Sequence, residues 1–368
     1  MPSDKTAASP SINGHYEDLV MLNIIDHIPE ALLSASHTEL YGLLGGPTLI
    51  HLDGRRKEPL FISVLLHGNE DTSFYAMQKL LTKYQGQTLP RALSIFIGNV
   101  EAAKHNQRRL DGQPDYNRVW PGCEELDIVT PEQAAMQTVY NEMKARNVFT
   151  SIDIHNNTGL NPHYGCINRL DPASMHLAAL FSRTAVYFIR PKGVQSLAFS
   201  DLCPAITLEC GKIGESRSIE HALEYIEANL HLSEHPKHPV ASHDIDLFHT
   251  VAQVRIPPQS HFGFECDDCD LSFSKDLEYL NFRELPIGSQ FGTSDSLRHL
   301  EVINEQGDPV TEQFFTLKNN EIHTRRPLMP SMLTMNQQVI RQDCLCYLME
   351  RLPLADIDVT THHLKHTS

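Results

Sequence analysis

Between residues 48 and 231, short apolar runs alternate with segments whose apolar residues recur every three or four positions. Apolar runs of this length are typical of strands buried on both faces of a parallel sheet, and the longer spacing is typical of helices packed on that sheet. The predicted strands are 48–52, 61–66, 92–98, 149–155, 185–189 and 204–209, and the predicted helices are 74–84, 130–143, 171–183 and 219–230. This alternation predicts an α/β layer domain.

The pattern changes on either side of this stretch. Residues 1–18 are rich in Ser, Pro, Ala and Thr, which predicts a disordered segment, and a helix is predicted over about 19–34. The predicted strand 48–52 is followed by a charged turn at 53–56, and residues 232–244 have the composition of a linker. The predicted layout is a disordered segment at 1–18, an α/β domain at 19–242 and a β-rich domain at 243–368 that includes a helix over 337–351.

Three of the predicted strands end in side chains that can bind metal or carry protons. His67 and Glu70 follow one strand, and His155 and Glu209 end two others. Open α/β sheets place their ligand sites at the carboxyl ends of the strands, so these side chains are expected to lie together. Two imidazoles and a carboxylate with one open position form a catalytic zinc set, and a further glutamate could act as general base. The alternative for His155 alone is a hydrogen-bonded core histidine.

The spacing of His67 and Glu70 is weak evidence by itself, because His-x-x-Glu occurs four times in the chain. Only this pair follows a predicted buried strand. Asp153 lies two residues before His155, on the same face of its strand, where it could accept a hydrogen bond from a metal-bound imidazole.

Residues 99–130 show neither helical nor strand periodicity, and a loop of this length inside a domain is usually functional. It carries Arg108, Arg109, Asn117 and Arg118 close to the single tryptophan, Trp120. Arginines on such a loop could hold a substrate carboxylate or a developing oxyanion. The alternative is a surface loop with solvated arginines.

Composition narrows the classes of partner. The formal charge of −16 argues against nucleic acid and anionic membranes, and no apolar stretch is long enough for a membrane helix. The eight cysteines show no disulfide-scaffold spacing, and no secretory signal is recognisable, so a reducing, cytoplasmic setting is predicted. Cys266 and Cys269 could form a structural zinc site with Cys344 and Cys346, but reduced, unliganded thiols are favoured.

Residues 60–215 carry a series of motifs in the same order as in a known family. On these motifs the chain resembles the succinylglutamate desuccinylase/aspartoacylase family of the zinc carboxypeptidase clan. The motifs that carry the resemblance are His67-Gly68-Asn69-Glu70, Gly98-Asn99, Arg108-Arg109, Asn117-Arg118-Val119-Trp120-Pro121-Gly122, Asp153-Ile154-His155-Asn156 and Leu208-Glu209-Cys210-Gly211. The resemblance implies a three-layer α/β/α domain with a mixed sheet, followed by a smaller β-rich domain over the site.

The resemblance also implies roles for the strand-end residues. One zinc ion per chain would be held by His67, Glu70 and His155, and Glu209 would be the general base. The family is one of hydrolases, so residues 19–242 would form a zinc hydrolase domain.

For the loop, the resemblance implies that Arg109 or Arg108 polarises the scissile carbonyl and that Asn117 and Arg118 bind the polar head of the substrate. The interval between Arg109 and Asn117 is one residue longer than in aspartoacylases. The resemblance therefore does not decide which of Arg108 and Arg109 has this role. Residues 195–208 hold no Arg or Lys where aspartoacylases carry an arginine for an acidic side chain, which argues against N-acetylaspartate.

These features predict a zinc-dependent hydrolase that cleaves an amide bond in a small N-acyl amino acid or a related carboxylate. A metallocarboxypeptidase acting on peptides is the alternative. A non-catalytic binding protein is disfavoured because all four strand-end residues are present. Neither nucleic acid nor membrane is expected as a partner, and a homo-oligomer is left open.

Overall fold

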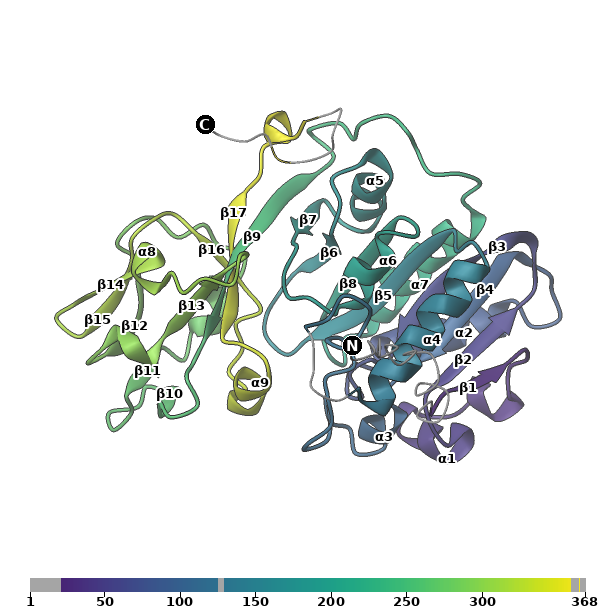
Figure 1. Cartoon of the computed structure of the whole chain (residues 1–368), viewed down its shortest axis with the longest axis horizontal. Helices are drawn as coiled ribbons and strands as arrows, with labels where there is room; N and C mark the ends of the chain where they lie inside the picture. Colours follow the sequence, from purple (N-terminus) through teal and green to yellow (C-terminus); the bar gives the residue numbers. More distant parts are fainter. Residues whose placement is uncertain (1–20, 125–128, 359–363, 365–368) are drawn as a thin grey trace, which may run out of the picture.

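The computed structural model describes residues 21–124, 129–358 and 364 and contains two β-sheets (Figure 1). The predicted disordered segment at 1–18 lies outside the described residues. The larger sheet has twelve strands in the order β1-β2-β4-β3-β5-β8-β6-β7-β9-β17-β16, with β13 paired to β9. Its strands are β1 (Asn23–Ile25), β2 (Thr48–Leu52), β3 (Gly54–Val64), β4 (Leu89–Ile97), β5 (Thr150–Asn157), β6 (His163–Ile167), β7 (Thr184–Tyr187), β8 (Ala205–Lys212), β9 (Asp246–Arg255), β13 (Glu301–Asn304), β16 (Met329–Ser331) and β17 (Cys346–Arg351).

Helices cover both faces of the larger sheet, so the fold is a three-layer α/β/α arrangement with a mixed sheet, as predicted. The α-helices are α1 (Leu40–Leu44), α2 (Thr72–Lys83), α3 (Val100–Ala103), α4 (Pro131–Ala145), α5 (Pro172–Phe181), α6 (Gln195–Phe199), α7 (Ser216–His231), α8 (Thr311–Phe314) and α9 (Gln337–Gln342). Ile62 of β3 packs into one core with α2, α5 and α7, while Phe61 packs into another with α4 and α6. Alternate residues of a strand point to opposite faces, which explains why neighbours enter different cores.

The centre of the sheet positions the candidate site. β3, β5 and β8 run parallel, with Ile62 opposite Ile152 and His155 opposite Glu209. Their carboxyl ends therefore meet at one edge of the sheet. β6 pairs antiparallel with β8, which makes the sheet mixed.

The smaller sheet follows β9 and lies apart from the helix-covered part of the molecule (Figure 1). Its strands are β10 (Phe262–Phe264), β11 (Leu271–Phe273), β12 (Gln290–Ser294), β14 (Phe315–Lys318) and β15 (Glu321–Thr324). The smaller β-rich part is thus present as predicted. The boundary at residue 243 stays a prediction, because β9 pairs both with β7 before it and with β13 and β17 after it.

Two predictions near the N-terminal side are wrong. Within the described part of 19–34 there is no α-helix; instead β1 pairs parallel with β2, and a short 3-10 helix covers Glu30–Leu33. Strand pairing overrides the local spacing there, and Pro29 cannot donate a helical hydrogen bond. The predicted turn at 53–56 is also absent, because β3 already begins at Gly54, opposite Leu89.

The helix predicted over 337–351 is correct only at its start. α9 ends at Gln342, and residues 346–351 form β17, which pairs antiparallel with β9. The side chains from Cys346 to Met349 are all buried, so the apolar run belongs to a strand buried on both faces. Among the described helices, none is long and apolar enough to cross a membrane.

The prediction for one cysteine pair is wrong as well. Cys266 and Cys269 form a disulfide, whereas Cys344 and Cys346 are free and buried. The two cysteines of a Cys-x-x-Cys turn can lie close enough to form a disulfide when they are oxidised.

Candidate functional site

The end of β3 is shaped so that His67 and Glu70 point to the same place. Leu65 takes a φ of 55°, a conformation that costs a bulky residue about 1 kcal/mol or more. Gly68 packs on α3 so closely that a Cβ there would lie 2.2 Å from the backbone nitrogen of Ala103. The Glu70 amide donates to the His67 carbonyl oxygen, which closes the turn. Only glycine fits this turn, and the turn brings both side chains to the edge of the sheet.

His67, Glu70 and His155 converge, as the sequence predicted, and their ligand atoms lie within 4.8 Å of one another. Nδ1 of His67 lies 2.8 Å from Oε1 of Glu70, and Nδ1 of His155 lies 2.7 Å from Oε2. The two Nδ1 atoms are 3.1 Å apart. All three side chains are buried. Two imidazole nitrogens and a bridging carboxylate thus face a single point.

The outer nitrogens of both imidazoles are held by carboxylates. Nε2 of His67 lies 3.0 Å from Oδ1 of Asp115, and Nε2 of His155 lies 2.8 Å from Oδ2 of Asp153. A carboxylate accepts a hydrogen bond from a ring N–H, so Asp115 and Asp153 favour a hydrogen on each Nε2. A metal ion would then take the place of any proton on the Nδ1 atoms that face Glu70. This donor set fits a divalent metal ion of the zinc type.

The charges around this point also favour a cation. Burial lowers the pKa of His155, but attraction to the carboxylates of Asp153 and Glu70 outweighs it and holds that pKa well above its usual value. Burial raises the pKa of Glu70, but His67 and His155 outweigh it and hold that pKa below its usual range. Positive charge is therefore stabilised between these residues.

Glu209 has a different environment from Glu70. It lies near the carboxyl end of β8, in register with His155, and its Oε2 accepts a hydrogen bond of 2.8 Å from Nδ2 of Asn157. Burial raises the pKa of Glu209, His155 and Arg108 lower it, and the neighbouring carboxylates of Glu70 and Asp153 raise it, so that the pKa lies at about 8. Of the two glutamates, Glu209 is thus the one suited to accept and release a proton near neutral pH.

The two adjacent arginines face different ways. Arg108 lines the cavity, and its guanidinium contacts Glu70 at 3.2 Å and Asp115 at 3.4 Å. Arg109 is not among the cavity-lining residues; it donates to the carbonyl oxygen of Gln113 at 2.7 Å and so braces the loop. The geometry therefore brings Arg108, rather than Arg109, to the candidate metal ligands.

Arg118 and Asn117 also line the cavity, but their polar groups already have partners. Arg118 donates to Asp343 at 3.0 Å, and Asn117 donates to Asp153 at 3.1 Å. The side-chain oxygen of Asn117 accepts the Gln195 backbone amide at 2.9 Å. Asn117 thus holds Asp153 in place, and its predicted contact with substrate stays a prediction.

The cavity has a volume of about 110 Å³. Its walls come both from residues before β9, such as His67, and from residues after β9, such as Tyr347. Its apolar wall consists of Tyr164, Cys166, Val186, Phe188, Pro191, Val194, Met332, Val339, Cys344 and Tyr347. A wider hollow of about 800 Å³ adjoins it and shares Arg118, Arg190 and Asp343. Residues that follow β9 in the chain therefore help to close the site.

Asp115, Asp343 and Tyr347 are charged or polar residues of the site that were not found from the sequence. Asp115 holds His67, Asp343 contacts both cavity arginines, and Tyr347 lies 3.4 Å from Arg118. Asp115 stands two residues before Asn117, just as Asp153 stands two before His155, and that parallel could have pointed to it. Asp343 and Tyr347 lie more than 220 residues away from Arg118 in sequence and carry no local signal.

Comparison with known proteins matches residues 57–228 to the model described as the succinylglutamate desuccinylase/aspartoacylase catalytic domain. No curated protein matches the sequence significantly. The fold is similar to that of succinylglutamate desuccinylase from Chromobacterium violaceum, with a TM-score of 0.55 and 16% identity over 82% of this chain and 86% of that one.

Two further solved structures share the fold. Murine aminoacylase 3 has a TM-score of 0.53 and 13% identity over 81% of this chain and 96% of that one. A product-bound ectoine utilization protein from Ruegeria pomeroyi has a TM-score of 0.53 and 14% identity over 82% and 88%. At these identities the likeness concerns the fold alone.

Proposed function

Because residues 57–228 belong to the succinylglutamate desuccinylase/aspartoacylase family, we propose that this chain is a zinc-dependent hydrolase of the amide bond in a small N-acyl amino acid or related carboxylate. The family and the similar structures carry the names desuccinylase, aspartoacylase and aminoacylase, which denote removal of an acyl group from an amino acid. The observation that carries the proposal is the convergence of His67, Glu70 and His155 beside a second, differently tuned glutamate.

In the proposed enzyme one zinc ion per chain would be held by His67, His155 and the Glu70 carboxylate. Bound there, zinc would supply Lewis-acid activation of water and of the substrate carbonyl. Asp115 and Asp153 accept hydrogen bonds from the Nε2 atoms and so orient each Nδ1 towards the place where the metal would bind. The apolar part of the cavity wall lowers the local polarity and so strengthens electrostatic interactions inside.

Glu209 is the proposed general base. Its Oε2 is engaged by Asn157, which leaves Oε1 to take a proton from water and to pass it to the leaving amine. Its burial keeps the carboxyl pKa close enough to neutrality for both steps. No such exchange is available to Glu70, whose pKa lies below its usual range.

Arg108 is proposed to polarise the scissile carbonyl, since its guanidinium lies beside Glu70. Arg118 is proposed to bind the carboxylate of the substrate, at a place now shared with Asp343. The apolar wall around Phe188 and Met332 favours an uncharged acyl group or side chain over a second carboxylate.

The experiment is a hydrolysis screen of zinc-loaded protein against N-acyl amino acids with acetyl, succinyl and longer acyl groups. Free amino acid is measured as product, and the Glu209→Gln variant is run in parallel at equal zinc content. Release that depends on Glu209 supports the proposal. Absence of release for every N-acyl amino acid, together with release from peptides, would replace it by the second candidate below.

The second candidate is a metallocarboxypeptidase, and the adjoining hollow of about 800 Å³ favours it. That hollow begins at Arg118 and Asp343 and extends past Gln253 and Arg341, so a peptide could lie along it. The same screen separates the candidates if blocked dipeptides and tripeptides with free carboxyl ends are included. A deacylase loses activity as the peptide lengthens, whereas a carboxypeptidase gains it.

A further inference from the structure

A second group of potential metal ligands lies in the smaller sheet, away from the site described above. β10 and β11 are parallel neighbours, with Phe262 opposite Leu271. Parallel strands usually need a connection of a dozen residues or more, yet only residues 265–270 link these two. Cys266 and Cys269 lie in this short link and form a disulfide, with their Cα atoms 5.6 Å apart.

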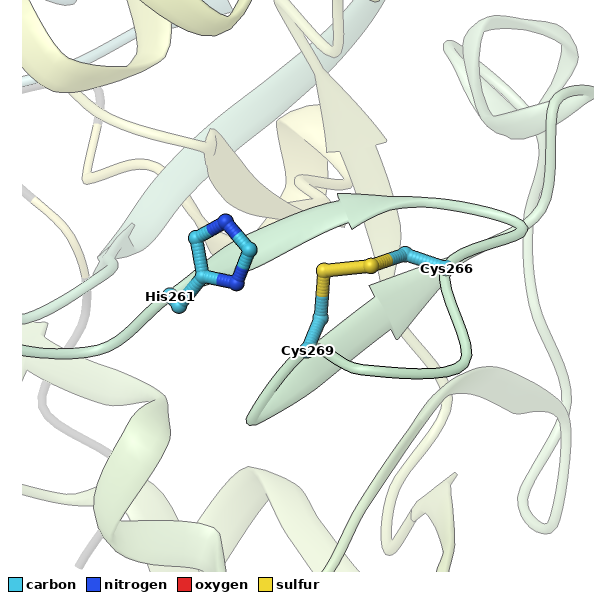
Figure 2. A group of neighbouring side chains, drawn as sticks. All are labelled: His261, Cys266 and Cys269. Carbon is cyan, nitrogen blue, oxygen red and sulfur yellow. A yellow bond between two sulfur atoms is a disulfide. The ribbon is translucent and has the colours of Figure 1, made fainter.

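His261 completes the group. It directly precedes β10, and Figure 2 shows its ring beside the two sulfur atoms. A ring nitrogen and both sulfurs lie within 4.8 Å of one another. The side chain of Asp270 accepts a hydrogen bond of 2.7 Å from the backbone amide of His261. This bond ties His261 to the far end of the same link. An imidazole and two sulfurs are thus held close together at one short turn.

The turn is built closely around the sulfurs. A Cβ on Gly263 would lie 2.9 Å from the Cβ of Cys266 and 3.1 Å from the sulfur of Cys269, so only glycine fits beneath them. The backbone amide of Cys266 donates to Ser272 at 2.9 Å. These contacts do not depend on the sulfur–sulfur bond, so the turn has support of its own when that bond is broken.

The surroundings favour a cation and admit a reductant. The link contributes Glu265, Asp267, Asp268 and Asp270, and of these Glu265 has a lysine partner, Lys275. The two cysteines are partly exposed and His261 is exposed, so a small thiol can reach the disulfide. Thiolates on this acidic turn would be disfavoured unless a cation neutralised them.

We propose that reduction of the Cys266–Cys269 disulfide by a dithiol converts this turn into a zinc site of two thiolates and the His261 imidazole. In the exchange the sulfur–sulfur bond breaks, the two cysteines each gain an electron and a proton, and the dithiol is oxidised to a disulfide. Zinc binding then releases both thiol protons to solvent. The fourth position is open to water, because His261 lies at the surface.

The geometry needs little rearrangement. A zinc–sulfur bond of about 2.3 Å with tetrahedral angles separates two sulfurs by about 3.8 Å. Rotation about the Cα–Cβ bonds achieves this separation without moving Cα atoms that are 5.6 Å apart. The proposal does not depend on the function proposed above, because the two groups of ligands share no residue. The two sites can also be told apart, since the candidate catalytic ligands include no sulfur.

Cobalt(II) distinguishes the two sites, since only a thiolate ligand gives an intense near-ultraviolet charge-transfer band. Oxidised full-length protein loaded with cobalt should lack this band. Protein reduced with dithiothreitol, freed of reductant without oxygen and then loaded should show it. Zinc content by elemental analysis should rise by one ion per chain after reduction.

Matched variants assign the ligands. Cys269→Ser should abolish the band and the additional zinc ion, whereas Cys123→Ser, which removes a partly exposed free thiol elsewhere, should keep both. His261→Ala retains the disulfide and removes an exposed ring, so it should fold and, once reduced, should bind zinc at least about tenfold more weakly. An unchanged zinc content after confirmed reduction, or an unchanged affinity in His261→Ala, would overturn the proposal.

Discussion

The carboxylate of Asp343 lies 3.0 Å from the guanidinium of Arg118, at the arginine proposed to bind the substrate carboxylate. The other oxygen of the same carboxylate lies 3.3 Å from Arg108. Burial raises the pKa of Asp343, but the two arginines outweigh it and hold that pKa below its usual value, so the group is ionised. A substrate carboxylate must therefore share or displace a negative charge that the chain itself supplies.

Replacing Asp343 with asparagine should strengthen the binding of free-acid substrates. The amide keeps the size of the side chain but removes the competing charge, so we expect KM to fall by roughly tenfold, which corresponds to about 1.4 kcal/mol. Steady-state kinetics with a free-acid substrate and its amidated analogue measure the effect. The amidated analogue, which has no charge to gain from the vacated arginines, serves as the control. A higher KM for both substrates would instead mean that Asp343 holds the arginines in place.

The adjacent arginines provide a matched pair of variants. Arg108→Ala should lower kcat by on the order of a hundredfold or more, the usual effect of losing a donor to a developing oxyanion. Arg109→Ala should change kcat much less, since Arg109 faces the carbonyl oxygen of Gln113 rather than the cavity. Both variants remove the same charge, and circular dichroism would check that both fold. Equal losses of kcat would contradict the assignment of Arg108.

The sequence was most informative where a local pattern of residues also fixes a position in the sheet. A buried strand followed by a polar residue fixes both the direction of the strand and the edge at which the residue lies, which is why the positions of His67, His155 and Glu209 could be predicted. The adjacent Arg108 and Arg109 could not be separated, because a loop without periodicity does not fix the orientation of its side chains. Gly68 in its tight turn sets the geometry that brings Glu70 to the site.

The sequence was least informative where distant segments pair. β1 was predicted as part of a helix because its pairing with β2 leaves no local pattern. Asp343 and Tyr347 reach the cavity only because β17 pairs with β9 and carries the end of α9 towards Arg118. Long-range pairing of this kind depends on the whole sheet and cannot be read from a window of neighbouring residues.

The metal ligands can be tested by removing one ligand and, separately, one of its supporting carboxylates. His155→Ala should lose most of its zinc. Asp153→Asn should retain the ligand but bind zinc roughly 10- to 100-fold more weakly, since it loses the carboxylate that holds the His155 tautomer. Zinc content by elemental analysis and competition with a chelator measure the two effects. Unchanged zinc in His155→Ala would rule out the ligand set.

The activity of the zinc-loaded protein should fall as pH is lowered, because Glu209 accepts a proton only when ionised. Burial raises the pKa of this carboxyl to about 8, and a bound dication lowers it, so the midpoint of the fall in kcat/KM should lie between about 4.5 and 8. Asn157→Ala removes a hydrogen bond to the carboxylate and should move the midpoint to higher pH. A midpoint that does not move in this variant would separate the pH dependence from Glu209.

The role of Glu209 can be separated from metal binding by comparing it with Glu70. Glu209→Gln preserves size and can still bond to Asn157, but it cannot accept a proton, so turnover should fall by about two to four powers of ten with zinc content unchanged. Glu70→Gln should lower zinc content and turnover together, because the Glu70 carboxylate lies between both histidines. If Glu209→Gln loses zinc as well, Glu209 is a ligand and another group must be the base. Near-normal turnover at full zinc occupancy would refute the proposed mechanism, whereas lost folding stability with residual turnover in the folded fraction would assign Glu209 a structural role.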